Sequence, residues 1–262
     1  MAEAKTGIVV DAPVLVQRQD WWARLTINRP RMRNAANMAT WQLIGDEVGR
    51  LAQDPDLRVL FITGAGEQAF MAGADLTEFP KILENRENIK AYLAVVSRAC
   101  DQLEALDIPV IAEINGSAIG GGLELACACD YRIAVEESKF SIPSADVGLG
   151  LAYADIARLV ALVGTMRTRE LLLFGKTYDA AGAHAIGLVN EVVPRNQLFK
   201  RSKDIGNDIA AKAPLSIRSS KKVLLSVVHA REANYSEAIE SIFAAWESAE
   251  MKRRVNKWLN RD

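Results

Sequence analysis

The sequence has few of the side chains that bind transition metals or form disulfides. Its 262 residues include two histidines, His184 and His229, and three cysteines, Cys100, Cys127 and Cys129. Two histidines cannot build a three-histidine zinc site, so any transition-metal site would need carboxylate ligands. Three cysteines without paired spacing argue against a disulfide framework and are typical of a protein in a reducing compartment.

The chain also lacks an excess of either charge and any long apolar run. Lys and Arg total 32, Asp and Glu total 33, and the net charge is -1. This balance gives no electrostatic indication of a nucleic acid or an anionic membrane as a partner. No stretch approaches the roughly 18 uncharged apolar residues of a membrane span, and the start lacks the pattern of a secretory signal. The simplest expected location is the cytoplasm, or a matrix compartment if a transit peptide has been removed.

Apolar material is nevertheless plentiful. Hydrophobic residues make up 50% of the sequence and charged residues 25%, as in ordinary globular proteins, so global disorder is excluded. Short β-rich runs at 14–19 and 22–28 predict an antiparallel pair of strands. Apolar runs at 58–64, 108–116 and 130–136 predict strands that are buried on both faces, hence a parallel sheet covered by helices.

Helical spacing of apolar residues occurs between these strands and through the second half of the chain. The predicted helices span residues 37–52, 89–106, 155–163, 165–174, 179–186, 197–213, 214–229 and 235–258. After residue 154 only one short strand, within 187–193, interrupts them. Strands that alternate with helices up to about residue 145 indicate the α/β class. No linker precedes the later helices, so we expect them to form a layer on the same fold.

Two glycine-rich segments, at 63–76 and 114–130, follow predicted buried strands. Glycine there lets backbone N–H groups approach a ligand, and the start of the next helix adds the positive end of its dipole. Such a turn can bind a phosphate or stabilise an oxyanion. Neither segment fits the dinucleotide pattern, and the sequence has no P-loop and no nucleophile elbow. Tight packing of a strand against the next helix explains one glycine-rich segment equally well. Two such segments after neighbouring strands favour a ligand site with two backbone N–H donors.

A carboxylate follows the glycines Gly120 to Gly122 in the second segment. In a helix that begins near Gly121, Glu124 would lie in the first turn. Interaction with the helix dipole is one explanation for that placement. A general acid or base beside a backbone oxyanion hole is the other. The chemistry of the residues alone leaves both open.

Five segments occur in an order and spacing that match a known family. They are INRPRMRNA at 27–35, AFMAGADLTEF at 69–79, IPVIAEINGSAIGGGLELACACDYRIA at 108–134, FSIPSADVGLG at 140–150 and AIGLVNEVVP at 185–194. The third segment is highly specific, and the others are strong in combination. The chain thus resembles the crotonase, or enoyl-CoA hydratase/isomerase, superfamily over nearly its whole length.

The resemblance implies an α/β fold with a spiral core of repeated ββα units and a C-terminal helical layer. On this basis residues 1–195 form the spiral core, and residues 196–262 form a helical region that builds a homotrimer or a dimer of trimers. The resemblance also implies an acyl-CoA thioester as substrate, with coenzyme A as part of that substrate, and no metal or redox cofactor. Neither a nucleic acid nor a membrane is expected as a partner.

In this family two backbone N–H groups hold the thioester carbonyl, and the matching motifs place them at Ala74 and Gly121. Proton transfer beside a thioester passes through an enolate-like state, to which each donor contributes about 3 kcal/mol.

The resemblance further places the nucleotide and pantetheine of the substrate against two segments, largely through backbone atoms. The candidate CoA-binding residues there are Arg33, Ala35, Ala72, Asp75 and Leu76. Arg33 could meet a phosphate or could be a solvated surface arginine.

Glu124 matches one of two glutamates that hydratases of this family use, and the other is expected where this sequence has Ser144. Serine cannot act as a base without a partner, although it can position a water. Three interpretations follow: Glu124 acts with Ser144 orienting the water, Asp146 or Asp155 supplies a second carboxylate, or the reaction is not hydration. We expect Asp146 to be a turn or surface residue and Asp155 to be an acid near a helix start.

The leading hypothesis is hydration or dehydration of an enoyl-CoA, with Glu124 as general acid/base and Ser144 as the second site residue. The alternatives on the same scaffold are an enoyl-CoA isomerase, a decarboxylase, a hydrolase, or a non-catalytic acyl-CoA-binding protein. The length of the acyl chain depends on the residues around 82–93, which we expect to line the pocket.

Overall fold

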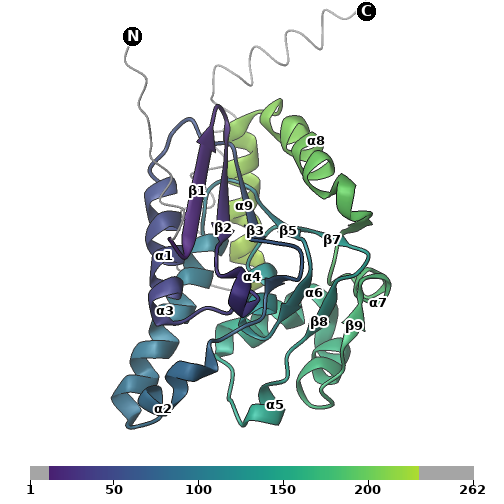
Figure 1. Cartoon of the computed structure of the whole chain (residues 1–262). Coiled ribbons are helices and arrows are strands. Elements are labelled where there is room, and N and C mark those ends of the chain that lie inside the picture. The colour runs from purple at the N-terminus through teal and green to yellow at the C-terminus, as the bar shows by residue number, and fades with distance from the viewer. Residues whose placement is uncertain (1–11, 230–262) are drawn as a thin grey trace, which may run out of the picture.

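The computed structural model describes residues 12–229, which are built around a six-stranded sheet (Figure 1). Its strands are, in spatial order, β1 (Val14–Gln19), β2 (Trp22–Ile27), β3 (Val59–Gly64), β5 (Val110–Ile114), β7 (Tyr131–Val135) and β10 (Glu191–Val193). β1 and β2 pair antiparallel, and all the other neighbours pair in parallel. The predicted antiparallel pair and the predicted parallel core are both confirmed.

A second, smaller sheet accompanies the first. Its strands are, in spatial order, β4 (Ala69–Met71), β6 (Ser117–Ile119), β8 (Lys139–Ser141) and β9 (Tyr178–Asp179). Each of β3, β5 and β7 is followed within a few residues by β4, β6 and β8 respectively, and β4, β6 and β8 pair in parallel. The chain therefore repeats a ββα unit, as the resemblance implies, and belongs to the α/β class.

Helices connect and cover the strands. They are α1 (Met38–Leu51), α2 (Phe79–Ile82), α3 (Arg86–Glu104), α4 (Gly121–Cys127), α5 (Ser144–Val147), α6 (Tyr153–Leu172), α7 (Ala180–Ala185), α8 (Leu198–Ala210) and α9 (Pro214–His229), with single 3-10 turns η1 (Pro30–Met32), η2 (Leu76–Glu78) and η3 (Arg195–Gln197). The helix predicted at 235–258 lies outside the described residues. The predicted division of the chain at residue 195 remains a prediction.

The helices predicted at 155–163 and 165–174 are confirmed as the two parts of α6, which meet at Gly164, where the backbone is not helical and φ is 72°. One detail of the second half differs from the expectation. The short strand β9 also lies in this half, so the expectation that only one strand interrupts the helices was wrong. Two-residue and three-residue strands are too short to show the alternation by which a strand is identified in a sequence.

Both faces of the large sheet are buried, as its continuous apolar strands require. All six residues of β3 are buried. Leu60 and Ile62 pack into the main core together with side chains of α1 and α3, whereas Val59 and Phe61 pack on the opposite face with Leu198 of α8. Successive side chains of a strand point to opposite faces, so β3 contributes to both layers. The strand ends from which the site loops begin are thereby fixed.

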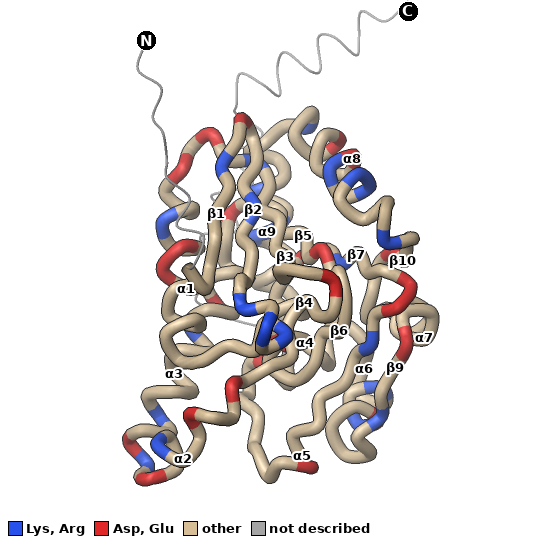
Figure 2. The backbone as a smooth tube through the Cα atoms, viewed as in Figure 1, with Lys and Arg blue, Asp and Glu red and all other residues tan. Residues whose placement is uncertain are grey.

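The described chain has a mixed surface and a cysteine-containing core. Positive and negative side chains are interspersed along its length (Figure 2). Among residues 12–229 no helix is long and apolar enough to cross a membrane. All three cysteines are buried, and burial raises the pKa of the Cys127 thiol to about 12. They act as small apolar side chains of the core.

Gly122 allows α4 to approach β4, which suggests a test of this packing. A Cβ added at Gly122 would lie 2.1 Å from the carbonyl oxygen of Met71. We expect Gly122→Ala to lower the free energy of unfolding by about 1–3 kcal/mol, because backbone must move to relieve the contact. Urea denaturation followed by circular dichroism measures the change.

The matched control is Gly49→Ala in α1, where the nearest neighbour of an added Cβ is the Gln102 side chain at 3.5 Å. This substitution meets an ordinary contact and removes a glycine from a helix, so it should stabilise the protein by up to about 1 kcal/mol. Equal stability of Gly122→Ala and the wild-type protein would contradict the proposed close packing.

Candidate active site

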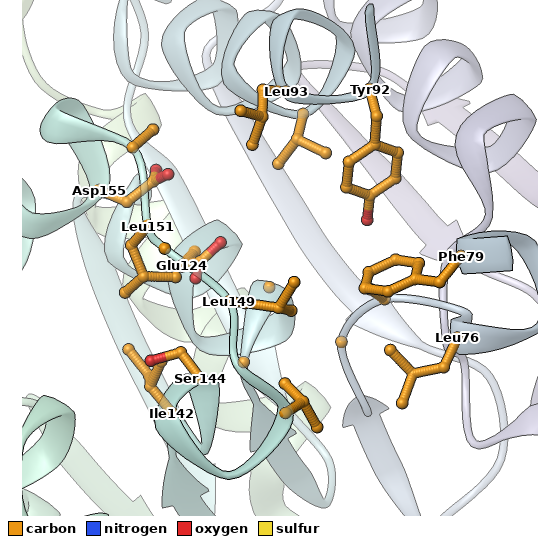
Figure 3. A pocket seen from close by; sticks show the side chains of 18 of the residues that line it. Leu76, Phe79, Tyr92, Leu93, Glu124, Ile142, Ser144, Leu149, Leu151 and Asp155 are labelled. Atoms are coloured by element: carbon orange, nitrogen blue, oxygen red, sulfur yellow. The ribbon is translucent and has the colours of Figure 1, made fainter. Parts of the chain in front are cut away.

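A cavity of about 360 Å³ lies at the ends of three strands of the small sheet. Its walls come from the segments that follow β4, β6 and β8, together with side chains of α2 and α3 (Figure 3). Most of the lining is apolar, and Glu124, Ser144 and Asp155 are among the few polar side chains that reach it. Such a lining suits an apolar ligand that is oriented by a small number of polar groups.

Two loops meet at one end of the cavity. Gly73, with φ of 95°, faces the segment after β6, and a Cβ added there would lie 2.8 Å from the Ile119 carbonyl oxygen and 3.4 Å from the Gly121 nitrogen. The backbones of the two loops are therefore in direct contact, which requires glycine.

The predicted pair of N–H donors lies at this contact. Ala74 follows Gly73 and Gly121 is the first residue of α4, and both line the cavity. Within residues 12–229, the N–H groups of Ala74 and Gly121 donate no hydrogen bond to a backbone carbonyl of a loop, a turn or a helix cap. The first N–H groups of a helix have no partner within the helix. Two such donors can together stabilise a negatively charged oxygen.

Glu124 lies in the first turn of α4, as predicted, and its side chain is 6% exposed. Its Oε2 would lie 3.8 Å from a Cβ added at Gly121, so the carboxyl group lies close to that residue. Within residues 12–229 no group donates a hydrogen bond to this carboxyl. Glu124 is therefore a buried acid that is free to interact with a ligand in the cavity.

Burial raises the pKa of Glu124 to about 8, from an ordinary value of 4.5, and the negative charge of Asp155 adds to the rise while Arg158 opposes it. The acid is mostly protonated at neutral pH, so it can donate a proton. Stabilisation of a carboxylate by the helix dipole would lower this pKa instead. Of the two explanations that the sequence left open, the environment favours the acid/base role.

Asp155 is a second buried acid in the cavity wall. It lies in the first turn of α6 with 4% of its surface exposed, and Nη1 of Arg158 donates to its Oδ1 at 2.9 Å. Arg158 also donates to Glu104 at 3.1 Å and pairs with Asp101. Burial raises the pKa of Asp155, while the positive charge of Arg158 opposes the rise.

The expectation that Asp155 is an acid near a helix start is confirmed, because it lies in the first turn of α6, which begins at Tyr153. Its side chain is buried and lines the cavity, as one of the interpretations left open requires. Its interior pairing with Arg158 was not predicted. The available signal was the spacing of Asp155 and Arg158, three residues apart among apolar neighbours. Residues at this spacing share one face of a helix, so two charges there can pair in the interior.

The carboxylates around Arg158 converge on a guanidinium group. In the described ranges no group of three or more His, Cys, Asp and Glu side chains is arranged to hold a metal ion. His184 is exposed, and its Nδ1 lies 3.1 Å from the carbonyl oxygen of Val189.

Ser144 is the first residue of α5 and lines the cavity. In Figure 3 it lies on the same side of the cavity as Glu124 and Asp155, with Ile142 beside it. Asp146, two residues further on, is exposed and does not contribute to the lining, which confirms the expected surface position. Of the two aspartates that the sequence offered as a second carboxylate, only Asp155 reaches the cavity.

The candidate CoA-binding residues lie in two segments that meet beside the cavity. The N–H of Ala72 donates to the carbonyl oxygen of Arg33 at 3.0 Å and so joins the two segments. Ala72 and Leu76 line the cavity, whereas the Arg33 side chain is exposed outside it. The backbone at Arg33 is left-handed, with φ of 50°, and its side chain points away from the core.

The other two candidates are buried and bound to their surroundings. Ala35 is 9% exposed, and its carbonyl oxygen accepts a hydrogen bond from Arg29. The Asp75 carboxyl accepts hydrogen bonds from Arg29 at 2.8 Å and from the Thr77 hydroxyl at 2.7 Å. Asp75 thus fixes the loop that carries Ala74, and its carboxyl group is already satisfied.

The wall opposite Glu124 is formed by the region expected to contact the acyl chain. Ile82, Leu83, Ile89 and Leu93 all line the cavity, which confirms that expectation. Tyr92, which the sequence analysis did not single out, also lines it. Burial raises the pKa of this phenol to about 12. The hydroxyl therefore stays neutral and adds a polar group to an apolar wall.

Comparison with known proteins supports a family assignment. The family model described as enoyl-CoA hydratase/isomerase matches residues 18–261. A short-chain-enoyl-CoA hydratase of Clostridium acetobutylicum is 34% identical over 211 residues, which cover 80% of this chain and 80% of that protein. A crotonyl-CoA hydratase of Syntrophomonas wolfei is 37% identical over 210 residues, which cover 79% of each.

Solved structures give the same result for the fold. A putative enoyl-CoA hydratase/isomerase family protein from Hyphomonas neptunium superposes with a TM-score of 0.90 and is 29% identical, with 96% of each chain covered. An enoyl-CoA hydratase/carnithine racemase from Magnetospirillum magneticum superposes with a TM-score of 0.88 and is 31% identical, with 94% of this chain and 92% of that chain covered.

The raised pKa of Glu124 predicts a specific pH dependence of stability. The folded protein binds a proton at Glu124 more tightly than the unfolded chain does, so this stabilisation is complete below pH 4.5 and is lost as the pH rises to about 8. Gln at position 124 does not ionise, so the Glu124→Gln variant does not lose this stability as the pH rises. Between pH 5 and 8 the variant should therefore gain a few kcal/mol in free energy of unfolding relative to the wild-type protein, at about 1.4 kcal/mol per pKa unit.

Urea denaturation at pH 5 and at pH 8 measures this difference. Glu84→Gln is the control, because Glu84 is exposed and lies outside the cavity, and it should leave the difference unchanged. A Glu124→Gln variant that loses as much stability as the wild-type protein over this range would contradict the assigned protonation.

Proposed function

The chain belongs to the enoyl-CoA hydratase/isomerase family, and from this premise we propose that it catalyses the reversible addition of water to the double bond of an enoyl-CoA. The observation that carries the proposal is the buried acid Glu124 beside the free N–H of Gly121, at one end of an apolar cavity. Hydration of a conjugated thioester needs a proton donor, a stabilised enolate and a dry site, and these features supply all three.

The N–H groups of Ala74 and Gly121 stabilise the thioester oxygen in this reaction. Attack of water at the β-carbon moves electrons onto that oxygen, and two fixed donors stabilise the resulting enolate by about 3 kcal/mol each. Their support comes from the contact between the Gly73 loop and the start of α4, which holds both N–H groups at one place. Fixed donors cost no reorganisation when the charge develops.

Glu124 delivers the proton to the α-carbon, and Ser144 orients the water. The neutral carboxyl of Glu124 is the acid, and in the reverse direction its conjugate base removes the α-proton. Ser144 can hold a water by its hydroxyl but cannot activate it strongly, so we propose that it positions the nucleophile.

Coenzyme A enters as part of the substrate, and the reaction needs no further cofactor, because proton transfer and enolate stabilisation are supplied by the chain. We propose that backbone atoms near Ala72 and Leu76 contact the pantetheine and that exposed Arg33 contacts a phosphate. Ala35 and Asp75 support this region by holding the two segments in place.

The homotrimer or dimer of trimers expected from the resemblance remains part of the proposal. Within the described chain, several large apolar side chains on and just after α6 are exposed, among them Tyr153, Met166, Leu173 and Phe174. Contacts between copies of the chain would cover such side chains. A cytoplasmic location is proposed from the reduced, buried cysteines.

Replacement of the acid tests the reaction directly. Glu124→Gln should lower kcat for the hydration of crotonyl-CoA by at least about two orders of magnitude, because the amide cannot exchange the required proton. Binding of crotonyl-CoA, measured by calorimetry, should persist because the cavity and both N–H donors are unchanged. Turnover equal to that of the wild-type protein would rule out Glu124 as the acid.

Mass analysis of the product separates hydration from its alternatives. Hydration adds the mass of one water, whereas an isomerase leaves the mass unchanged. A wild-type protein that binds crotonyl-CoA and β,γ-unsaturated acyl-CoA but shifts only the double bond would be an isomerase. Tight binding with no product at all would indicate a non-catalytic protein.

Ser144 provides a second test of the hydratase assignment. Ser144→Glu places a second carboxylate on the same side of the cavity as Glu124, where it can take a proton from water, so crotonyl-CoA hydration should increase. Ser144→Gln has a side chain of similar size without the charge and should give no increase. If a folded Ser144→Glu variant binds substrate but hydrates it no faster, the water is activated by another group or the reaction is different.

A further inference from the structure

Asp155 and Glu124 are two buried acids from neighbouring helices that line one cavity. Glu124 lies in α4 and Asp155 in α6, and the two helices pack against each other. Their side chains are 6% and 4% exposed. In Figure 3 both carboxyl groups lie on the same wall, with Asp155 on the side of Glu124 away from Ser144. Asp155 thus lines the cavity on the other side of Glu124 from Ser144, the position of the missing glutamate.

Arg158 fixes the position of Asp155. Its guanidinium is 3% exposed and donates through Nη1 to Oδ1 of Asp155, so one carboxylate oxygen is held at 2.9 Å. No other hydrogen bond joins the Asp155 carboxyl to a described residue. The second oxygen is therefore available to a neighbour in the cavity wall.

The charges around Glu124 favour a shared proton. Arg158 is the cation of the cluster, and its charge is divided among Asp155, Glu104 and Asp101. From α3, Tyr92 and Cys100 face the same region, and burial raises the pKa of both groups, so both are neutral. Of the two buried carboxylates only Asp155 pairs with this guanidinium, whose charge is already shared, so Glu124 and Asp155 cannot both be ionised at low cost.

We propose that Asp155 and Glu124 form a carboxyl pair that holds one proton between them, with Asp155 as a positioning residue that keeps Glu124 loaded as the acid. Asp155 acts through Glu124 and does not touch the substrate. The pair stands on the burial and placement of the two side chains, while its use in turnover rests on the proposed hydration.

The pair restores the proton that hydration consumes. The water oxygen forms a bond to the β-carbon, the π electrons move toward the thioester, and Glu124 transfers its proton to the α-carbon. One of the two protons of the attacking water then passes to the carboxyl pair, which again carries one proton, and the other stays on the new hydroxyl group. The sum is one enoyl-CoA and one water converted to one 3-hydroxyacyl-CoA, and no second carboxylate at position 144 is required.

Carbon-13 NMR on protein labelled at the Glu and Asp carboxyl carbons tests the pair without any substrate. In the wild-type protein the signals of Glu124 and Asp155 should shift together in one step near pH 8, because coupled groups titrate as a unit. Glu124→Gln and Asp155→Asn assign the two signals. An Asp155 signal that does not move in the step that Glu124 shows would overturn the proposal, and this result needs no variant that is difficult to fold.

Asp155→Asn should move the titration of Glu124 downward by about one pH unit or more, because a negative neighbour is removed. Asparagine can still accept the hydrogen bond from Arg158 through Oδ1. Asp101→Asn is the matched control, since Asp101 also pairs with Arg158 but lies outside the cavity. A purely structural role of the cluster would give the same effect in both variants, and that result would also overturn the proposal.

The pH profile of crotonyl-CoA hydration links the pair to turnover. Its alkaline limb should move to lower pH in Asp155→Asn and stay in place in Asp101→Asn, with KM little changed in both. An unmoved limb in an active Asp155→Asn variant contradicts the pair. A wild-type protein that shows the joint titration but no hydration would instead refute the proposed function and leave the pair intact.

Discussion

Close contact between the loop after β4 and the start of α4 is the constraint on which the rest of the site depends. Gly73 and Gly122 allow it, because a Cβ at either position would lie within 2.8 Å of a backbone oxygen of the other segment. The contact brings the N–H groups of Ala74 and Gly121 to one end of the cavity and places Glu124 one helical turn further on. Donors and acid are thus positioned by backbone packing, which is more rigid than side-chain packing.

The same packing determines the electrostatics. Glu124 is removed from water by α3, α4 and α6, and its neutral form is favoured because of this burial and because no group among residues 12–229 donates a hydrogen bond to its carboxyl. Arg158 is buried close by, yet three carboxylates share its charge. Burial favours the neutral form of any carboxyl group. In this protein the buried carboxyl of Glu124 also lines the cavity, where its proton can be transferred to a ligand. A charged residue near an active site therefore need not ionise that site's acid.

The elements that could be predicted from the sequence are those with long or distinctive patterns. Fully apolar β3 and the spacing of α1 were sufficient to assign them, and the glycines before Glu124 were sufficient to locate the helix that carries it. The small sheet could not be predicted from periodicity, since its strands have two or three residues each. The interior pairing of Asp155 with Arg158 was not predicted, because a helical pattern gives the face of a residue but not the neighbour that the face meets.

The sequence by itself determined the α/β class, the two glycine turns and the presence of Glu124 in the first turn of a helix, because these depend on local patterns of residues. Only the tertiary structure decided which acids share the cavity: Asp155 lies in its wall, whereas Asp146 is exposed. It also decided that burial raises the pKa of Glu124 and that the carboxyl of Asp75 accepts hydrogen bonds from Arg29 and Thr77. The reason is physical, since burial and pairing are set by segments that are distant in the chain and meet only in the folded protein.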